Sequence, residues 1–492
     1  MFYNKIINPK TGRKVNIGSK LGQNILNNFI LELRGGTKTT ELKERLDVII
    51  DCDPGVDDML ALMLALSPYA RDVTEEGPEQ PINVIAITCV FGNQIDPDIL
   101  ERNARFAIKL TGHHEIPVIM GARKPLYYDF LGKEGMAIHG NGGIGGAVLE
   151  HDKPVENIQL QRWERGEWFG TKEGEKGMYA PRVLYPKPKN KEDYLSRNEA
   201  AEYIKRMVED REDNDKICLV TLGPFTNLAD AIILGLNTNQ IHSVFSMGGS
   251  FGIPGGNAFA ASECNVGNDI DAAKIVLTEP NYCKMVLVPL NLTHQLELEP
   301  LRQNFKEVES TSNGYDVSNF LFRMTDHYCN TVYSYGQTEN PIHDPATVMA
   351  LINPSLFTNW KKQHVDVETR RCDLGSAVAL GATIADWNGH WTNPSGFKGF
   401  RLQYTGRPDR QVGSKITILR ESDAKSFNET YMTAIKTIQN KAESTDIENW
   451  LNKECDCGEC KEMRLKFKEQ GKRDGQELRT ATRARRVAVN VV

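Results

Sequence analysis

The sequence predicts an α/β protein built on a doubly wound, mostly parallel sheet. Short, nearly continuous apolar runs alternate with longer segments that carry apolar residues at helical spacing. Strands buried on both faces have such runs, and their alternation with helices is typical of a parallel sheet covered on both sides. Polar or glycine-rich clusters follow several runs. Ligands of these sheets bind beyond the carboxyl ends of the strands, so the clusters are candidate site residues.

The elements can be placed in order from about residue 46. The run 48–50 predicts the first strand, and 58–66 predicts a helix that buries Met59, Leu62, Met63 and Leu66. Further strands are predicted at 83–88, 117–120, 216–222, 243–247 and 284–290. Further helices are predicted at 104–110, 225–236 and 270–278.

The composition is that of a globular protein, with 40% hydrophobic and 25% charged residues among 492. The formal net charge of −6 gives no overall nucleic-acid signature. No apolar run approaches the roughly 20 residues that a membrane helix needs, and the N-terminus lacks the apolar core of a secretory signal. We therefore expect a cytoplasmic protein with no membrane contact. Single cysteines such as Cys89, Cys218 and Cys283 are expected to be buried and reduced.

Three regions are predicted along the chain. Residues 1–45 form a basic, polar N-terminal extension, and residues 46–440 form the main α/β domain. A stretch at about 152–198, rich in Lys, Glu, Trp, Tyr and Pro, interrupts the domain as a surface insertion that could act as a lid. Residues 441–492 form a charged tail that contains cysteines.

An acidic motif directly follows the first predicted strand. Asp51, Asp53, Asp57 and Asp58 place four carboxylates within eight residues. Close carboxylates repel one another, and burying them unpaired is costly. A cation would offset this charge, and hard oxygen ligands favour Ca²⁺ or Mg²⁺ over zinc. The alternative is an acidic turn with solvated side chains, and the distant polar clusters weigh against it.

The other polar clusters lie at the ends of apolar elements, as loops that assemble one site at a sheet edge do. They are 91–94 (FGNQ), 139–146 (HGNGGIGG), 222–229 (LGPFTNLA), 247–249 (MGG), Asn257 with Glu263 and Asn265, 291–295 (NLTHQ) and 342–346 (IHDPA).

With these clusters, the chain from about 46 to about 419 resembles the inosine-uridine preferring nucleoside hydrolase family. The DxDxxxDD motif, the GPxTN turn, the MGG strand end, the Asn/Glu/Asn set and the late HDP occur in the family's order. The resemblance implies a Rossmann-like sheet of the nucleoside hydrolase type. It also implies calcium-dependent hydrolysis of the N-glycosidic bond of ribonucleosides to ribose and free base.

The resemblance assigns roles to particular residues. It implies a Ca²⁺ ion held by Asp53, Asp58, Asp344 and the backbone carbonyl of Leu222. The implied substrate-binding residues are Asp57 and Asn265 at the ribose hydroxyls, Asn257 and Glu263 at the 5′ side, Asn93 at the sugar and water, and Met247 along the pocket.

The chemistry of the reaction suggests the remaining roles. Hydrolysis passes through an oxocarbenium-like sugar, and a metal lowers the pKa of a bound water. Asp53 is the predicted general base, because it can contact both metal and water. His343 is the candidate general acid for the leaving base, since histidine titrates in the useful range. His139, on the glycine-rich loop, is a candidate contact for the base.

Plainer interpretations remain for several of these residues. An isolated His-Asp-Pro is commonly a helix start with Asp as N-cap. His139 could serve only the loop, and His294 could be a core histidine at the sheet edge. Thr226 and Asn227 are expected to cap the following helix. Cys264 departs from the aromatic or larger apolar residue common at its position in the family, which bears on substrate range.

Three functions are weighed against one another. The first is the hydrolase acting on a small ribonucleoside, as a homo-oligomer of two or four chains. The second is a non-catalytic nucleoside-binding or virion-associated protein that keeps the fold. The second rests on the basic extensions and on residues 8–14 (NPKTGRK), which weakly resemble an adaptor motif of large DNA viruses. The third is a different hydrolase that uses the calcium–ribose site on a modified or larger ribosyl substrate, and a lid formed by the insertion would favour small nucleosides over it.

The C-terminal region leaves two further questions open. Residues 461–486 contain ten Lys or Arg and four Asp or Glu, so this segment is basic. Such a charged segment predicts a solvated tail, with weak nucleic-acid contact as the alternative. Cys455, Cys457 and Cys460 lack a nearby fourth ligand for zinc and are expected to be an exposed, reduced cluster, with a zinc site shared between chains or a redox pair as the alternative.

Overall fold

The computed structural model describes thirteen stretches of the chain. They are residues 5–7, 14–16, 43–94, 97–126, 138–140, 142–145, 198–211, 217–309, 317–334, 338–370, 379–388, 391 and 415–443. The predicted insertion, the C-terminal tail with its three cysteines, and most of the N-terminal extension lie outside these residues. Within the extension, strands β1 (Lys5–Ile7) and β2 (Lys14–Asn16) pair as an antiparallel hairpin. The division into three regions stays a prediction.

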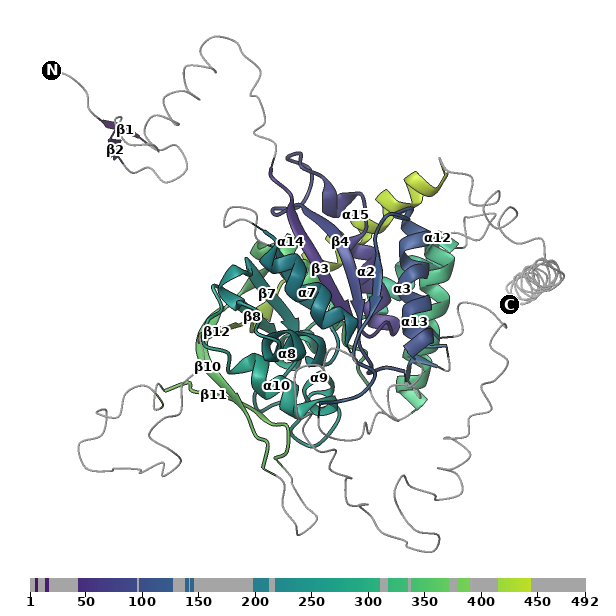
Figure 1. The fold of residues 1–492 in the computed structure, drawn as a ribbon. Helices are drawn as coiled ribbons and strands as arrows, with labels where there is room; N and C mark the ends of the chain where they lie inside the picture. The colour runs from purple at the N-terminus through teal and green to yellow at the C-terminus, as the bar shows by residue number, and fades with distance from the viewer. Residues whose placement is uncertain are drawn as a thin grey trace, which may run out of the picture.

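Within the described stretches, the core is a nine-stranded sheet in the order β11-β10-β12-β8-β7-β6-β3-β4-β5 (Figure 1). From β12 to β5 all neighbours run parallel, whereas β10 is antiparallel to both β12 and β11. The predicted mostly parallel sheet is therefore confirmed. The strands are β3 (Leu46–Cys52), β4 (Ile82–Cys89), β5 (Val118–Met120), β6 (Cys218–Thr221), β7 (Ser243–Met247), β8 (Met285–Val288), β10 (Lys361–Val367), β11 (Thr383–Ala385) and β12 (Lys415–Ile418).

Successive residues of each central strand face opposite sides of the sheet. In β3, Val48 and Ile50 join one hydrophobic core, while Ile49 joins the other. This follows from the two-residue period of a strand, and it explains why the predicted strands were continuous apolar runs.

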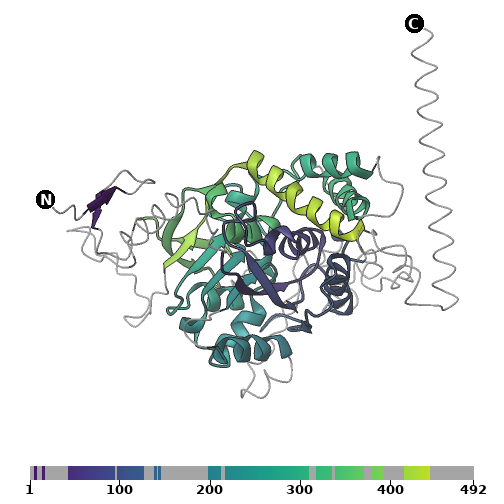
Figure 2. The same cartoon turned by 90° about the horizontal axis from the view of Figure 1, so that it is seen from above.

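Helices cover both faces, which makes the sheet doubly wound (Figure 2). One core packs against α2 (Val56–Ala65), α3 (Pro97–Thr111), α12 (Glu299–Glu309), α13 (Val317–Ser334), α14 (Asp344–Ile352) and α15 (Ala424–Glu443). The other core packs against α7 (Glu199–Glu209), α8 (Thr226–Ile233), α9 (Cys264–Asn268) and α10 (Ile270–Leu277). A short helix, α11 (Leu290–Thr293), directly follows β8.

The predicted elements occur where they were expected, with ends shifted by a few residues. Helices α7, α12, α13 and α15 were not predicted, nor were strands β10, β11 and β12. Cys283 was predicted to be buried and is exposed, because it lies in the loop between α10 and β8.

No helix among the described residues is long and apolar enough to cross a membrane. A small two-stranded sheet pairs β9 (Phe357–Thr358) with β13 (Glu421–Ser422).

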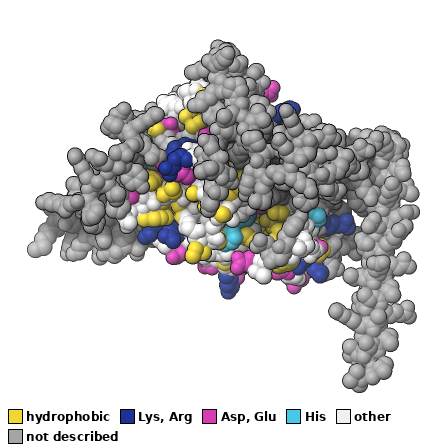
Figure 3. All heavy atoms as spheres, turned by 90° about the horizontal axis from the view of Figure 1, so that it is seen from below, with side chains coloured by type: hydrophobic (Ala, Val, Ile, Leu, Met, Phe, Trp, Pro, Cys, Tyr) yellow, Lys and Arg dark blue, Asp and Glu magenta, His cyan; other side chains and the backbone are white. Residues whose placement is uncertain are grey.

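The carboxyl ends of β3, β4, β6, β7 and β8 meet at one edge of the sheet, because neighbouring strands here are parallel. Seen from below, the molecule presents histidine, acidic and hydrophobic side chains together on one face (Figure 3). Apart from the glycine-rich loop at 139–146, the predicted polar clusters follow strands that end at this edge or lie at helices beside it.

Candidate active site

The acidic motif links the end of β3 to the first turn of α2. Asp58 closes this turn: its Oδ2 accepts the backbone N–H of Gly55 at 3.0 Å, and its Oδ1 accepts that of Asp53 at 3.1 Å. Asp57 and Asp58 both lie in the first turn of α2, where the helix dipole favours negative charge. The turn therefore holds two carboxylates at the sheet edge.

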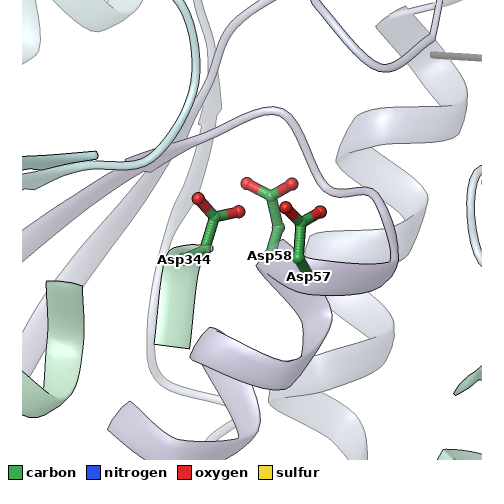
Figure 4. A group of neighbouring side chains, drawn as sticks. All are labelled: Asp57, Asp58 and Asp344. Carbon is green, nitrogen blue, oxygen red and sulfur yellow. The ribbon is translucent and has the colours of Figure 1, made fainter. Parts of the chain in front are cut away.

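A third carboxylate arrives from a second helix. Asp344 begins α14, with Pro345 in the first turn, and α14 packs against α2. Carboxylate oxygens of Asp57, Asp58 and Asp344 lie within 4.8 Å of one another and point the same way from the two helix starts (Figure 4). Residues nearly 290 positions apart thus form one acidic group.

Asp53 lies beside this group in a narrow space. A Cβ on Gly92 would stand 1.8 Å from Asp53 Oδ2, and one on Gly223 would stand 2.6 Å from Oδ1. The backbone N–H of Asn93 donates to Oδ2 at 2.8 Å. The side-chain amide of Asn93 donates to Asp58 Oδ2 at 2.9 Å and to the Asp53 carbonyl at 3.0 Å. Asn93 therefore fixes both carboxylates.

Crowding and burial shift the pKa of every carboxyl in the group. Burial, with Asp58 and Asp57 nearby, raises the pKa of Asp53 well above its usual range. Burial raises the pKa of Asp57 to about 6, and burial together with Asp57 does the same for Asp58. Burial and the three other aspartates raise the pKa of Asp344 well above its usual range. A cation among them would remove this electrostatic cost.

The donor set fits a hard divalent cation. All donors are oxygens, three carboxylates converge, and Oδ1 of Asp57 is buried without a hydrogen-bond partner among the described residues. These are the properties of calcium or magnesium ligands. Two of the three converging carboxylates, Asp58 and Asp344, were predicted as metal ligands. The third is Asp57, whereas the predicted third carboxylate was Asp53.

The other predicted ligand, the Leu222 carbonyl, follows β6. The amide nitrogen of Asn265 donates to it at 2.5 Å and lies 3.3 Å from the Met247 sulfur. Asn265 therefore ties the ends of β6 and β7 to α9. Both Met247 and Asn265 are buried at this edge.

Glu263 and Asn257 shape the start of α9. Glu263 is the N-cap, and its two oxygens accept the backbone N–H groups of Asn265, Val266 and Gly249 at 2.8–3.1 Å. Asn257 is exposed, and its Oδ1 accepts the Cys264 N–H at 2.8 Å. Both side chains thus contact backbone amides next to Asn265.

His139 reaches the acidic group from the glycine-rich loop. Its Nδ1 accepts the backbone N–H of Val56 at 2.9 Å and lies 3.9 Å from Asp57 Oδ1. Burial lowers the pKa of His139 to about 4. A ring whose Nδ1 accepts a hydrogen bond is neutral and carries its proton on Nε2. The loop itself is held by Gln94 and Asn103, which donate to the carbonyls of Gly140 and Gly142.

His343 is the N-cap of α14, one residue before Asp344. Its Nδ1 lies 2.9 Å from the Thr293 hydroxyl, and its ring centre lies 5.9 Å from that of His294. Burial, with His294 and His139 nearby, lowers the pKa of His343 to about 3. Burial therefore opposes the protonated form that a general acid needs, and the role of His343 as general acid stays a prediction. His294 is half-buried at the end of α11, near Glu339, and is not a core residue.

The predicted caps at α8 are also wrong. Phe225 is the N-cap, with no side-chain cap bond. Asn227 instead donates to Asp51 Oδ1 at 2.6 Å and to the Cys89 carbonyl at 3.1 Å. Thr226 donates to Asp269 at 2.7 Å. Asn227 therefore braces the strand end from which the acidic motif leaves.

Two residues near the site were missed. Tyr328 of α13 is buried, its ring lies 5.6 Å from that of His139, and its pKa is raised by burial and by the nearby Asp57. Thr293 contacts His343. Thr293 lies in the NLTHQ cluster, in which the neighbouring His294 was the residue considered for a role. Tyr328 had no sequence signal, since its helix was not predicted.

The chain is similar to several known proteins. Residues 48–428 match the family model described as inosine-uridine preferring nucleoside hydrolase. The chain is 30% identical over 344 residues to the inosine-uridine preferring nucleoside hydrolase of Crithidia fasciculata, covering 69% of this chain and 87% of that protein. It is 29% identical over 349 residues to the pyrimidine-specific ribonucleoside hydrolase RihA of Citrobacter koseri, covering 70% and 88%.

Solved structures support the fold. A plant nucleoside hydrolase matches with a TM-score of 0.55 at 23% identity, covering 80% of this chain and 99% of that one. A purine-preferring ribonucleoside hydrolase from Gardnerella vaginalis matches with a TM-score of 0.53 at 22% identity, covering 80% and 99%. Together with the family match, which spans most of the sequence, these findings show that the chain belongs to the inosine-uridine preferring nucleoside hydrolase family.

Proposed function

We propose that this enzyme hydrolyses the N-glycosidic bond of ribonucleosides in a calcium-dependent reaction that gives ribose and free base. The observation that carries the proposal is the convergence of Asp57, Asp58 and Asp344 at the sheet edge, with Asp53 beside them. The names of the relatives, which act on inosine, uridine or pyrimidine ribonucleosides, support the substrate class.

In this proposal Asp53, Asp58, Asp344 and the Leu222 carbonyl hold the calcium ion. A bound divalent cation would lower the pKa of the carboxylates and of a coordinated water. The oxygen-only donor set supports a hard cation. Asp57, whose Oδ1 has no hydrogen-bond partner among the described residues, would bind a ribose hydroxyl together with Asn265.

Asp53 acts as the general base. It accepts one proton from the attacking water, whose oxygen bonds to C1′ while the C1′–N bond breaks and its electron pair goes to the base. The two hydrogen bonds from Asn93 hold Asp53 and Asp58 in place, which supports a part for Asn93 in orienting the water and sugar. The carboxylates favour the positive charge that develops on the sugar.

Two histidines serve the leaving base. Each has Nδ1 engaged by the protein, His139 by a backbone N–H and His343 by the Thr293 hydroxyl. His139 therefore carries its proton on Nε2, and His343 does so when the Thr293 hydroxyl donates to its Nδ1. His343 assists departure of the base as this donor, and His139 contacts the base.

Met247, Asn257 and Glu263 complete the proposed pocket. Met247 lines it, while Glu263 and Asn257 hold the start of α9 and define the 5′ side of the sugar. A dimer or tetramer of this chain stays a prediction, which sedimentation of the purified protein would test. Cytoplasmic location and nucleic-acid contact by the basic tail stay predictions too.

The test is ribose release from uridine, cytidine, inosine and adenosine, measured with calcium-loaded enzyme. Release from at least one nucleoside, lost on chelation and restored by calcium, supports the proposal. A calcium-loaded enzyme that binds nucleosides without releasing ribose would instead favour the non-catalytic binding function. The panel also gives the base preference.

A further inference from the structure

Thr293 is the last residue of α11, the short helix after β8, and it lies beside His343. Its backbone N–H donates to the Pro289 carbonyl at 3.1 Å, and the residue is fully buried. Its Oγ1 lies 2.9 Å from Nδ1 of His343. A buried threonine has one strongly restricted side-chain torsion, so this hydroxyl has a defined position.

The backbone holds the two residues in register. The segment after Thr293 runs against the segment before His343: Leu298 N–H donates to the Asn340 carbonyl and Ile342 N–H donates to the Leu296 carbonyl, each at 2.8 Å. Glu297 and Pro341 form an antiparallel bridge between these bonds. Main-chain hydrogen bonds therefore join the segment after Thr293 to the segment before His343. This pairing keeps the Thr293 hydroxyl and the His343 ring in contact.

The hydroxyl contact decides which ring nitrogen remains available. With Nδ1 engaged by Thr293, Nε2 is the nitrogen left to face a departing base. A hydroxyl can donate to Nδ1 or accept from it, so the ring keeps the same position in either protonation state. The backbone N–H on Nδ1 of His139 can only donate. The two histidines are therefore held by chemically different partners.

We propose that Thr293 is a positioning residue for departure of the base, because its hydroxyl holds the His343 ring with Nε2 toward the leaving group. The proposal rests on the proposed function, since it concerns the same reaction. It adds a residue that does not touch substrate and acts only through His343.

The experiment compares Thr293→Val, Thr293→Ser and wild type on two kinds of ribosyl substrate. Uridine and inosine need help for the base to leave, whereas 4-nitrophenyl β-D-ribofuranoside releases a stable phenolate without it. Thr293→Val keeps the shape of threonine and lacks the hydroxyl, while Thr293→Ser keeps the hydroxyl. Thr111→Val is the matched control, since Thr111 is a buried threonine whose hydroxyl bonds to the Ala107 carbonyl far along α3.

We expect Thr293→Val to lower kcat on uridine or inosine about 10- to 100-fold, with KM and the kcat on the nitrophenyl riboside within about threefold of wild type. Thr293→Ser should restore most of the kcat, and Thr111→Val should match wild type. Equal loss on both kinds of substrate, or no loss on nucleosides, overturns the proposal. Wild type that cleaves no riboside overturns the proposed function instead.

A second measurement separates positioning from folding. Nitrogen chemical shifts of the His343 ring report its tautomer and hydrogen bonds in calcium-loaded protein. We expect them to change in Thr293→Val and to be restored in Thr293→Ser, whether or not a substrate is turned over. Unchanged shifts in Thr293→Val overturn the proposal. Should the valine variant fail to fold, Thr293→Ala takes its place in both measurements.

Discussion

The side-chain amide of Asn227 donates a 2.6 Å hydrogen bond to Oδ1 of Asp51, joining residues 176 positions apart. Thr88 donates to the same oxygen at 2.6 Å, and Asn227 Oδ1 accepts the Ala122 N–H at 2.8 Å. One amide thus connects β3, β4 and the loop after β5. Burial raises the pKa of Asp51 to about 7, so this carboxyl depends on its donors.

Replacing Asn227 should therefore destabilise the fold. Asn227→Ala leaves Asp51, the Cys89 carbonyl and the Ala122 N–H without this partner, and we expect a loss of about 3 kcal/mol in the free energy of unfolding. Urea denaturation measures the loss. Asn330→Ala is the control, because it removes an asparagine bonded to Asp326 at the surface and should cost less than about 0.5 kcal/mol. Equal costs would show that the Asn227 network contributes little.

Asp53→Asn should remove catalysis and keep the fold. General-base groups contribute about 10²- to 10⁴-fold, so kcat for ribose release should fall by that range while KM changes little. In the absence of calcium the melting temperature should not fall, because the substitution takes a buried carboxyl out of a crowded acidic group. A variant with kcat within about tenfold of wild type would rule out Asp53 as the base.

Calcium should stabilise the protein more at neutral than at acidic pH. Asp57 and Asp58 have pKa values of about 6 in the fold, against about 3.9 in an unfolded chain. Without calcium, the folded state binds extra protons between these values. The stability from these groups is thus full below about pH 4 and is lost as the pH rises through about 6.

Calcium held by Asp58 competes with its proton for the same oxygens, and the charge of the ion favours the ionised form of the neighbouring Asp57. The rise in melting temperature on adding calcium should therefore be larger at about pH 7.5 than at about pH 5. Thermal melts with calcium or a chelator at both pH values measure it. Asp344→Asn should shrink the rise at both, and a rise independent of pH would contradict carboxylate ligation.

Gly92→Ala should inactivate the enzyme, because the added Cβ would lie 1.8 Å from Asp53 Oδ2 and force the carboxylate away. We expect a loss of at least about 100-fold in kcat. Gly252→Ala is the control: its Cβ would meet nothing within 4 Å, although its φ of +87° costs about 1–2 kcal/mol of stability. Similar kcat values for both variants would show that Asp53 tolerates displacement.

Much of this molecule could be predicted from short-range patterns. The strand ending at Met247 was predicted to the residue, because its apolar run stops at two glycines. Helices α12, α13 and α15 are amphipathic and rich in polar residues, so their apolar positions form no continuous run that stands out in the sequence. The antiparallel direction of β10 depends on pairing across the sheet, which no local pattern records.

The site shows the same division. Asp57 and Asp58 were recognisable because they crowd one turn, and Asp344 because it shares a motif with His343. The hydrogen bond from Asn227 to Asp51 could not be predicted. An asparagine at a helix start has the same local sequence whether it caps the helix or contacts a residue 176 positions away. Likewise, the neutral state of His343 depends on burial, which involves residues from several elements.

The paired main chain before His343 also offers a way to observe the site without substrate. The amide protons of Leu298 and Ile342 are locked in hydrogen bonds between the two segments. Their exchange with deuterated solvent requires that these segments separate. Slow exchange at these two amides would therefore report an intact leaving-group side of the site, even in variants that have lost all activity.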